Sequence, residues 1–204
     1  MLKVGWFSTG NGKGSYDLLR YVKEAMGDEI DIPFCITDRS PGDAEGSDKF
    51  FKLLKEYNIQ RCTINLSPES KHLVGIYMDM LETYRPEVCV LGGYMKIIPS
   101  EVLADTRIPM LNLHPALPHG PTGTWQQVEE QLKKEGATES GIMIHLVTKE
   151  VDRGPVVSWC RYNFPSVEYV RIMSITREGP LMTVTLSGGF GDLTKAVNNL
   201  IINL

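Results

Sequence analysis

The sequence predicts an α/β fold: a Rossmann-like, open, mostly parallel sheet with helices on both faces. The first strand-like run, at 3–8, leads through the glycine-rich stretch Gly10–Gly14 into a segment with helical spacing at 16–26. Short apolar runs then alternate with helix-like segments, which is the order that βαβ units produce. We therefore expect a single domain over 1–204, with its core in 1–165 and a C-terminal segment, 166–204, packed on it.

The remaining elements follow from the spacing of apolar residues and from turn residues. Further strands are predicted at 30–36, 60–64, 88–93, 110–114, 141–147 and 156–162. Further helices are predicted at 47–57, at 67–84 behind the cap Ser67-Pro68, at 100–104 and at 124–135. The end of the chain predicts a helix at 167–177, either a strand or a helix at 181–186, and a closing helix at 193–204.

Composition excludes several classes of function. The net charge of −4 and the pI near 5.6 provide no basic surface for a nucleic acid or a membrane. The chain starts in a predicted strand and contains no apolar run long enough to span a bilayer, so we expect a cytoplasmic protein. The four cysteines are widely spaced and lack metal-ligand spacing, which predicts free, buried thiols in a reducing compartment.

The run Met110–Pro118 contains the first candidate site. In a strand, alternate residues share a face, so Asn112 and His114 project together where prolines end the strand. An amide donor beside an imidazole suits chemistry on a carbonyl, because the donor stabilises a developing oxyanion and the imidazole carries a proton. The structural alternative is that Asn112 closes a turn and His114 is a buried, hydrogen-bonded histidine, and the pair alone favours that alternative.

Two glycine-containing segments are candidate ligand sites. Gly10-Asn11-Gly12-Lys13-Gly14 lies between a strand and a helix, where backbone N–H groups and Lys13 can bind a phosphate-sized anion. Its spacing fits neither the nucleotide-hydrolase P-loop nor the dinucleotide motif, and a tight turn explains it equally well. Gly92-Gly93 ends the most strand-like run and permits close approach of a ligand, just before Tyr94–Ile98.

Four motifs in this order resemble the folate-dependent formyltransferase family, most closely its members in purine synthesis. The motifs are Gly10-Asn11-Gly12, the run Pro86–Ile98, Leu111-Asn112-Leu113-His114-Pro115, and His145-Leu146-Val147-Thr148 leading into Val151-Asp152-Arg153-Gly154. They cover roughly the first 165 residues. The resemblance favours catalytic roles for Asn112, His114 and Asp152 over structural ones.

The resemblance implies direct transfer of a formyl group from 10-formyltetrahydrofolate to the amine of glycinamide ribonucleotide, through a tetrahedral intermediate and without a metal. Asn112 and protonated His114 then stabilise the oxyanion, and Asp152 holds His114 as a cation and helps to remove the amine proton. His145 either supports these residues from a position next to them or has a buried structural role. The family also implies that Gly10, Asn11, Gly12, Lys13 and Gly14 hold the phosphate of the acceptor. Its pterin pocket would be lined by Tyr94, Met95, Lys96, Ile97, Ile98 and Val151.

Other functions remain open at this point. The same residues could formylate a different amine, hydrolyse formyltetrahydrofolate with water, or belong to a non-catalytic relative that binds folate or phosphate. The loop 116–123 is one residue shorter than in the family, and its His119 is either a substrate contact or an exposed loop histidine. The acceptor, the role of 166–204 and the existence of a homodimer are not fixed by the sequence.

Overall fold

The computed structural model describes residues 1–10, 12–43, 47–68, 70, 72–164, 169–176 and 179–187. The chain divides into two compact units, Met1–Leu111 and Asn112–Leu204. Strand β5 (Met110–His114) begins in the first unit and ends in the second. The single domain, and the packing of 166–204 on its core, stay predictions.

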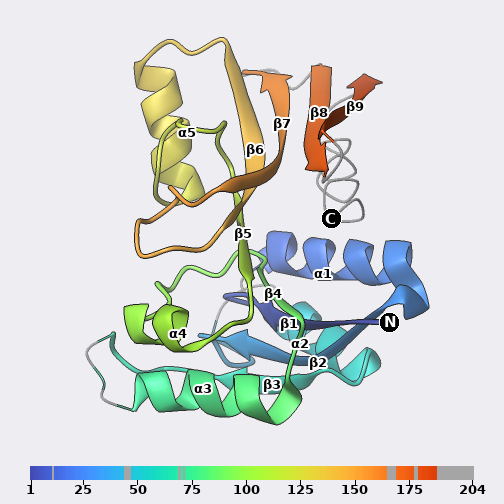
Figure 1. Cartoon of the computed structure of the whole chain (residues 1–204), viewed down its shortest axis with the longest axis vertical. Helices are drawn as coiled ribbons and strands as arrows, with labels where there is room; N and C mark the ends of the chain where they lie inside the picture. The colour runs from blue at the N-terminus through green and yellow to red at the C-terminus, as the bar shows by residue number, and fades with distance from the viewer. Residues whose placement is uncertain are drawn as a thin grey trace. The chain divides into compact units, whose positions relative to one another are not determined.

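The first unit is a parallel α/β structure. Its strands pair in the order β3-β2-β1-β4, and each pair is parallel. The strands are β1 (Leu2–Phe7), β2 (Ile30–Thr37), β3 (Gln60–Thr63) and β4 (Val88–Leu91). The helices are α1 (Gly12–Met26), α2 (Ser47–Glu56), α3 (Leu73–Tyr84) and α4 (Ser100–Asp105), with the short 3₁₀ helix η1 (Gly27–Glu29) after α1. Helix α1 packs beside α2, α3 packs beside α4, and α1 and α3 cover opposite faces of the strands (Figure 1). This arrangement confirms the predicted fold class.

Aromatic side chains form much of the interior of this unit. Phe7 stacks on Tyr77 with a centroid distance of 6.1 Å and meets Phe34 and Tyr94 edge to face. All four rings are buried. Strand β1 lies between β2 and β4, and its Val4, Trp6 and Phe7 are buried, as expected for a central parallel strand.

Two helix starts differ from the prediction. Helix α1 begins at Gly12 rather than at Tyr16, so Gly12–Gly14 form its first turn and are not a loop. Helix α3 begins at Leu73 rather than after Ser67, and residues before it form turns, with Ser70 N donating to Ser67 O and Leu73 N donating to Ser70 O. Tertiary context overrides local propensity at both places.

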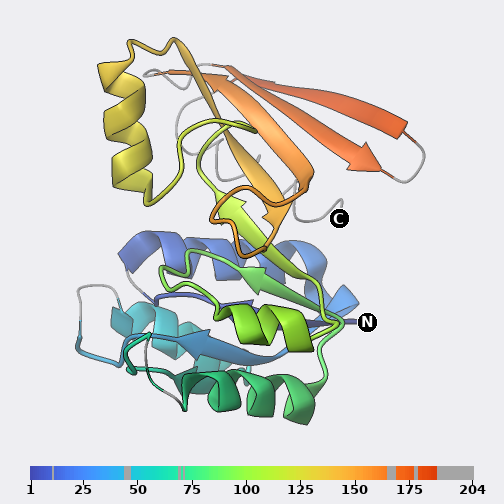
Figure 2. The ribbon, with the colours of Figure 1, turned by 60° about the vertical axis from the view of Figure 1, so that its left-hand side comes forward.

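The second unit contains helix α5 (Trp125–Lys134) and the strands β6 (Glu139–Leu146), β7 (Val156–Asn163), β8 (Tyr169–Thr176) and β9 (Gly179–Ser187) (Figure 2). Strands β6 to β9 pair in sequence order, and each pair is antiparallel. Thr124 caps α5 in a capping box with Gln127, which stabilises the predicted start of this helix. Ala116, Val128 and Leu132 form a buried cluster under α5.

The helix predicted at 167–177 is wrong, because Tyr169–Thr176 is a strand paired with β7 on one side and β9 on the other. Its β-branched and aromatic residues favour a strand once two partners are present. The segment 181–186, for which strand and helix were both open, lies within strand β9. The closing helix predicted at 193–204 lies outside the described residues.

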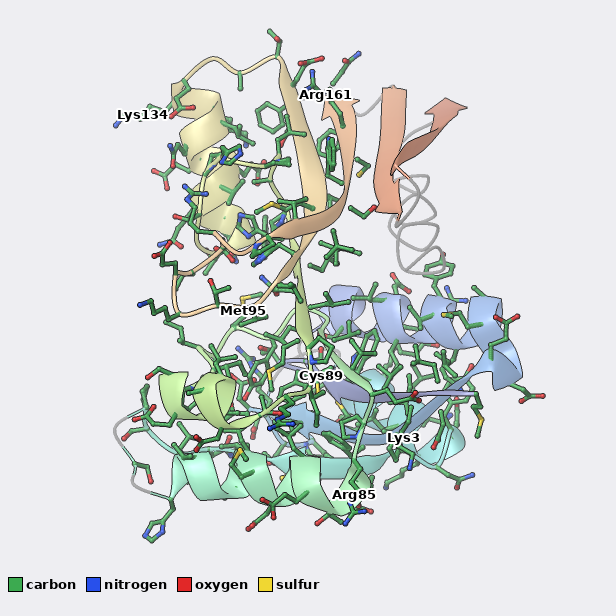
Figure 3. The ribbon with its side chains drawn as sticks, viewed as in Figure 1. Lys3, Arg85, Cys89, Met95, Lys134 and Arg161 are labelled. Atoms are coloured by element: carbon green, nitrogen blue, oxygen red, sulfur yellow. The ribbon has the colours of Figure 1, made fainter. Side chains whose placement is uncertain are left out.

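The four cysteines are free, as predicted. Cys89 lies in the interior of the first unit (Figure 3), and burial raises the pKa of its thiol to about 12. Burial likewise raises the pKa of Cys160 to about 11. Cys35 is also buried, whereas Cys62 is partly exposed. Within the described residues, no helix combines the length and the apolar character needed to cross a membrane.

Candidate active site

Strand β5 brings Asn112 and His114 to the same carboxylate. Asn112 Nδ2 donates a hydrogen bond to Asp152 Oδ1 at 3.2 Å, and His114 Nδ1 lies 3.5 Å from Asp152 Oδ2. The two side chains are separated by one residue in the strand and therefore point to one side, as the alternation predicts. The three residues predicted to be catalytic form one cluster, and all of them lie in the second unit.

Asp152 is presented by the loop between β6 and β7. A hydrogen bond from Leu146 N to Pro155 O closes the base of this loop. The backbone of Asp152 has a φ of 55°, in the left-handed region that aspartate tolerates better than most residues. Its side chain is 9% exposed. The hairpin thus holds a nearly buried carboxylate against β5.

His145 completes the cluster from β6. A register shift between Ile144 and His145 interrupts the pairing with β7, and such irregularities re-aim side chains beside functional sites. His145 Nδ1 donates to Leu146 O at 2.9 Å, which leaves Nε2 for the cluster. That nitrogen lies 3.2 Å from Asn112 Nδ2 and 3.6 Å from Asp152 Oδ1. His145 therefore contacts both Asn112 and Asp152, and its supporting role stays a prediction.

The surroundings of Asp152 stabilise its ionised form. Burial by itself raises the pKa of a carboxyl group, because it disfavours the charge. Contact with His145, the hydrogen bond from Gly123 N at 3.0 Å and the two imidazoles together outweigh burial, so the pKa of Asp152 lies below its ordinary value of 3.8. Asp152 is therefore an anion at neutral pH.

The second ring nitrogen of His114 faces a backbone carbonyl. His114 Nε2 donates to Pro121 O at 2.8 Å, while Nδ1 faces Asp152, and the side chain is only 3% exposed. Because a carbonyl and a carboxylate only accept, a ring protonated at both nitrogens satisfies both neighbours, whereas a neutral ring turns one lone pair toward an acceptor. The geometry fits an imidazolium.

This cluster can stabilise negative charge that develops beside it. It contains a fixed carboxylate, a buried imidazole suited to carry positive charge, and an amide whose N–H groups are donors. In the described part of the chain, no three His, Cys, Asp or Glu side chains are arranged as ligands for a metal ion. The requirement for a metal stays a matter of prediction.

The residues predicted to bind the acceptor's phosphate lie in the first unit. Gly10 adopts a left-handed φ of 71°, and Gly12–Gly14 form the first turn of α1, whose N–H groups have no partner within the helix. Asn11 and the side chain of Lys13 lie outside the described residues. The role of this segment stays a prediction.

The segment Tyr94–Ile98 also lies in the first unit and borders a pocket. The pocket is lined by Ile64, Leu66, Pro68, Leu73, Tyr77, Tyr94, Lys96 and Ile97. Its two tyrosine hydroxyls share a hydrogen bond of 2.6 Å. Of the other predicted pocket residues, Met95 and Val151 are exposed and Ile98 is buried in the core. That these residues line one site with the Asp152 cluster stays a prediction.

Sequence reasoning missed the backbone and loop partners of the cluster. Pro121 O accepts from His114, Gly123 N donates to Asp152, and Arg153 contacts Gly120 O in the adjoining loop. None of the three was singled out as a partner. Main-chain groups carry no residue-type signal, so the first two could not have been found from the sequence. His119 is exposed with a φ of 66°, which agrees with the exposed-loop alternative.

Comparison with known proteins shows which family the sequence around this cluster matches. Residues 44–162 match the family described as formyl transferase, a stretch that contains Asn112, His114, His145 and Asp152. The phosphoribosylglycinamide formyltransferase of Escherichia coli K12 is 34% identical over 77 residues, which cover 38% of this chain and 35% of that protein. The matched part thus spans about a third of the length of this curated relative.

Solved structures share the fold. The phosphoribosylglycinamide formyltransferase of Coxiella burnetii covers 98% of this chain and 81% of its own at a TM-score of 0.66 and 22% identity. A formyltetrahydrofolate deformylase from Burkholderia mallei covers 79% and 54%, at a TM-score of 0.63 and 20% identity. Since the family match extends over more than half of the chain and includes the whole Asp152 cluster, the chain belongs to the formyl transferase family.

Proposed function

We propose that the chain transfers a formyl group from 10-formyltetrahydrofolate to the amine of glycinamide ribonucleotide. The observation that carries the proposal is the convergence of Asn112, His114 and His145 on the ionised Asp152, within the part of the chain that matches the family. The curated relative from Escherichia coli is named for the same acceptor. The folate supplies an activated formyl carbonyl.

His114 is the source of positive charge in this proposal. Attack of an amine on a formyl carbonyl creates a tetrahedral carbon and a negatively charged oxygen, and an oriented cation in a site of low dielectric stabilises that oxygen. Asp152 Oδ2 and Pro121 O hold the ring of His114 from its two nitrogens. Because the pKa of Asp152 is lowered, its carboxylate keeps this cation paired. When the tetrahedral carbon collapses, its bond to the folate nitrogen breaks, the amine proton passes through water to that nitrogen, and tetrahydrofolate leaves.

Asn112 is the direct donor, and its availability depends on His145. The two hydrogens of Asn112 Nδ2 face Asp152 Oδ1 and His145 Nε2, each at 3.2 Å. The amide hydrogen that faces His145 Nε2 can turn to the oxyanion, while the hydrogen bond to Asp152 Oδ1 keeps the amide in place. His145 thus has a positioning role.

The ligand-binding parts of the proposal lie in the first unit. The N–H groups of the first turn of α1 and the left-handed Gly10 suit the phosphate of the acceptor, because a helix N-terminus attracts anions. The folate is proposed to lie along Tyr94–Ile98, where Lys96 supplies a positive charge for one of its carboxylates. A reducing compartment such as the cytoplasm is the proposed location, and the four free thiols support it.

A deformylation assay tests the proposal. Release of tetrahydrofolate from 10-formyltetrahydrofolate is followed spectroscopically, with and without glycinamide ribonucleotide. We expect turnover only when the acceptor is present, together with formylated acceptor in the products. Turnover without an acceptor would identify a hydrolase that uses water instead. Folate binding without turnover in either case would contradict the proposed acceptor and point to another amine.

A further inference from the structure

The loop between β5 and α5 is held at three points, two by residues of the Asp152 cluster and one by the neighbouring Arg153. Gly120 O accepts a hydrogen bond from Arg153 Nη1 at 3.0 Å. Pro121 O accepts from His114 Nε2 at 2.8 Å. Gly123 N donates to Asp152 Oδ2 at 3.0 Å. We call residues 120–123 the clamp loop, because backbone groups of Gly120, Pro121 and Gly123 form these three hydrogen bonds.

The clamp loop limits the hydrogen bonds that His114 can make and fixes the position of its ring. With Pro121 O on Nε2 and Asp152 on Nδ1, both ring nitrogens face acceptors inside the protein, and the side chain is 3% exposed. Neither N–H of the imidazolium is then free to point elsewhere. His114 acts as a fixed charge whose position depends on where the clamp loop places the carbonyl of Pro121. A displacement of this loop therefore displaces the charge.

The side chain of Arg153 joins the clamp loop to the β6–β7 loop from outside the cluster. Its Nη1 donates to Gly120 O at 3.0 Å and lies 3.5 Å from Asp152 O, so one guanidinium bridges the backbones of both loops. The turn hydrogen bond from Arg153 N to Glu150 O fixes the base of its own side chain. A guanidinium suits this task, because its fork of donors reaches two carbonyls at once.

We propose that the clamp loop holds His114 as a cation through the carbonyl of Pro121, and that Arg153 is the positioning residue that locks this loop. The kinetic part of the proposal rests on the proposed formyl transfer. The structural part does not, because it concerns the hydrogen bond of His114 Nε2 in the free protein. Arg153 touches no reacting group in this proposal and acts only through the two backbones.

The test compares Arg153→Met with Arg153→Lys, and uses Lys134→Met as the control. Lys134 is exposed and extends away from the end of α5 (Figure 3), so its loss removes a charge from the same unit without touching the clamp loop. The first readout is the imidazole N–H proton of His114 in nitrogen-15 NMR spectra of the free protein. A hydrogen-bonded, buried N–H exchanges slowly with water, and we expect Arg153→Met to speed this exchange about tenfold by letting the loop open.

The second readout is the kinetics of formyl transfer. We expect Arg153→Met to lower kcat about tenfold with KM for the folate unchanged, since a small misplacement of a catalytic group lowers the rate and not the binding. Arg153→Lys should recover much of this loss, because an ammonium can still donate to Gly120 O. Lys134→Met should match the wild-type protein in both readouts.

The outcomes separate the two proposals. Unchanged exchange of the His114 proton in Arg153→Met, with circular dichroism showing a folded protein, would overturn the locking role of Arg153 whatever the activity. Faster exchange in a protein whose wild type transfers no formyl group would support the clamp and overturn the proposed function. Faster exchange with an unchanged kcat would overturn the link between the clamp and catalysis.

Discussion

Asp152 is the residue on which the other side chains of the cluster converge. Its Oδ1 faces Asn112 and His145, and its Oδ2 faces His114 and Gly123 N. Its left-handed backbone places the carboxylate inward from the tip of a loop. Such convergence lowers the pKa of Asp152 and couples the ionisation of this one residue to the stability of the fold.

This coupling predicts how stability depends on pH. Since the pKa of Asp152 is lower in the folded than in the unfolded state, its stabilising effect is complete above the ordinary value of 3.8 and is lost as the pH falls through the folded-state pKa. We expect the free energy of unfolding in urea to fall on acidification, and Asp152→Asn to weaken that dependence. Asp79→Asn, at an exposed position of α3, should leave the pH dependence unchanged. Equal slopes for Asp152→Asn and the wild-type protein would contradict the account.

The β6–β7 hairpin is the element that sets the position of the carboxylate. Its loop is closed by the hydrogen bond from Leu146 N to Pro155 O, and Gly154 packs against the same strand end. A Cβ atom at Gly154 would come within 1.8 Å of Leu146 O, so only glycine fits there. The Asp-x-Gly pattern is thus explained by close backbone approach beside a left-handed aspartate.

Substitution of this glycine gives a prediction for the element. Gly154→Ala should cost about 3 kcal/mol of unfolding free energy, the upper end for overpacking, and should disturb Asp152 two residues away. Gly75→Ala is the matched control, because Gly75 lies in α3 with no atom within 4 Å of an added Cβ, and should stabilise the fold by about 1 kcal/mol. Thermal unfolding followed by circular dichroism measures both. A Gly154→Ala protein as stable as the wild type would show that the loop has another conformation.

At the scale of elements, the sequence predicts the strands better than it predicts where helices begin or what structure the C-terminal segment adopts. Strands β1 to β7 are predicted by short apolar runs that are bounded by turn residues and are too short for helices. The start of α1 was missed because glycines at Gly12 and Gly14 disfavour a helix locally. Strand β8 was missed because its pairing with β7 and β9 is a property of the sheet and not of the segment.

For the molecule as a whole, the side chains of the site were predictable and the backbone partners were not. Asn112 and His114 follow from strand alternation, and the resemblance adds Asp152 and His145, 40 and 33 residues beyond Asn112. The carbonyl of Pro121 and the N–H of Gly123 emerge only from the structure. The proposed function assigns formyl transfer to the second unit and ligand binding to segments of the first, and the family match spans parts of both.

The most direct test of the proposed role of His114 measures two properties of the His114→Ala protein: its rate of formyl transfer and its affinity for the folate. Turnover should fall by about 100-fold or more, as expected for loss of an oriented charge at an oxyanion. The affinity for the folate should stay close to that of the wild-type protein, because His114 is proposed to stabilise the oxyanion and not to bind the folate. His72→Ala, at an exposed histidine before α3, should retain full activity and controls for loss of an imidazole. If His114→Ala turned over like the wild-type protein, the cluster around Asp152 would not be the centre of formyl transfer.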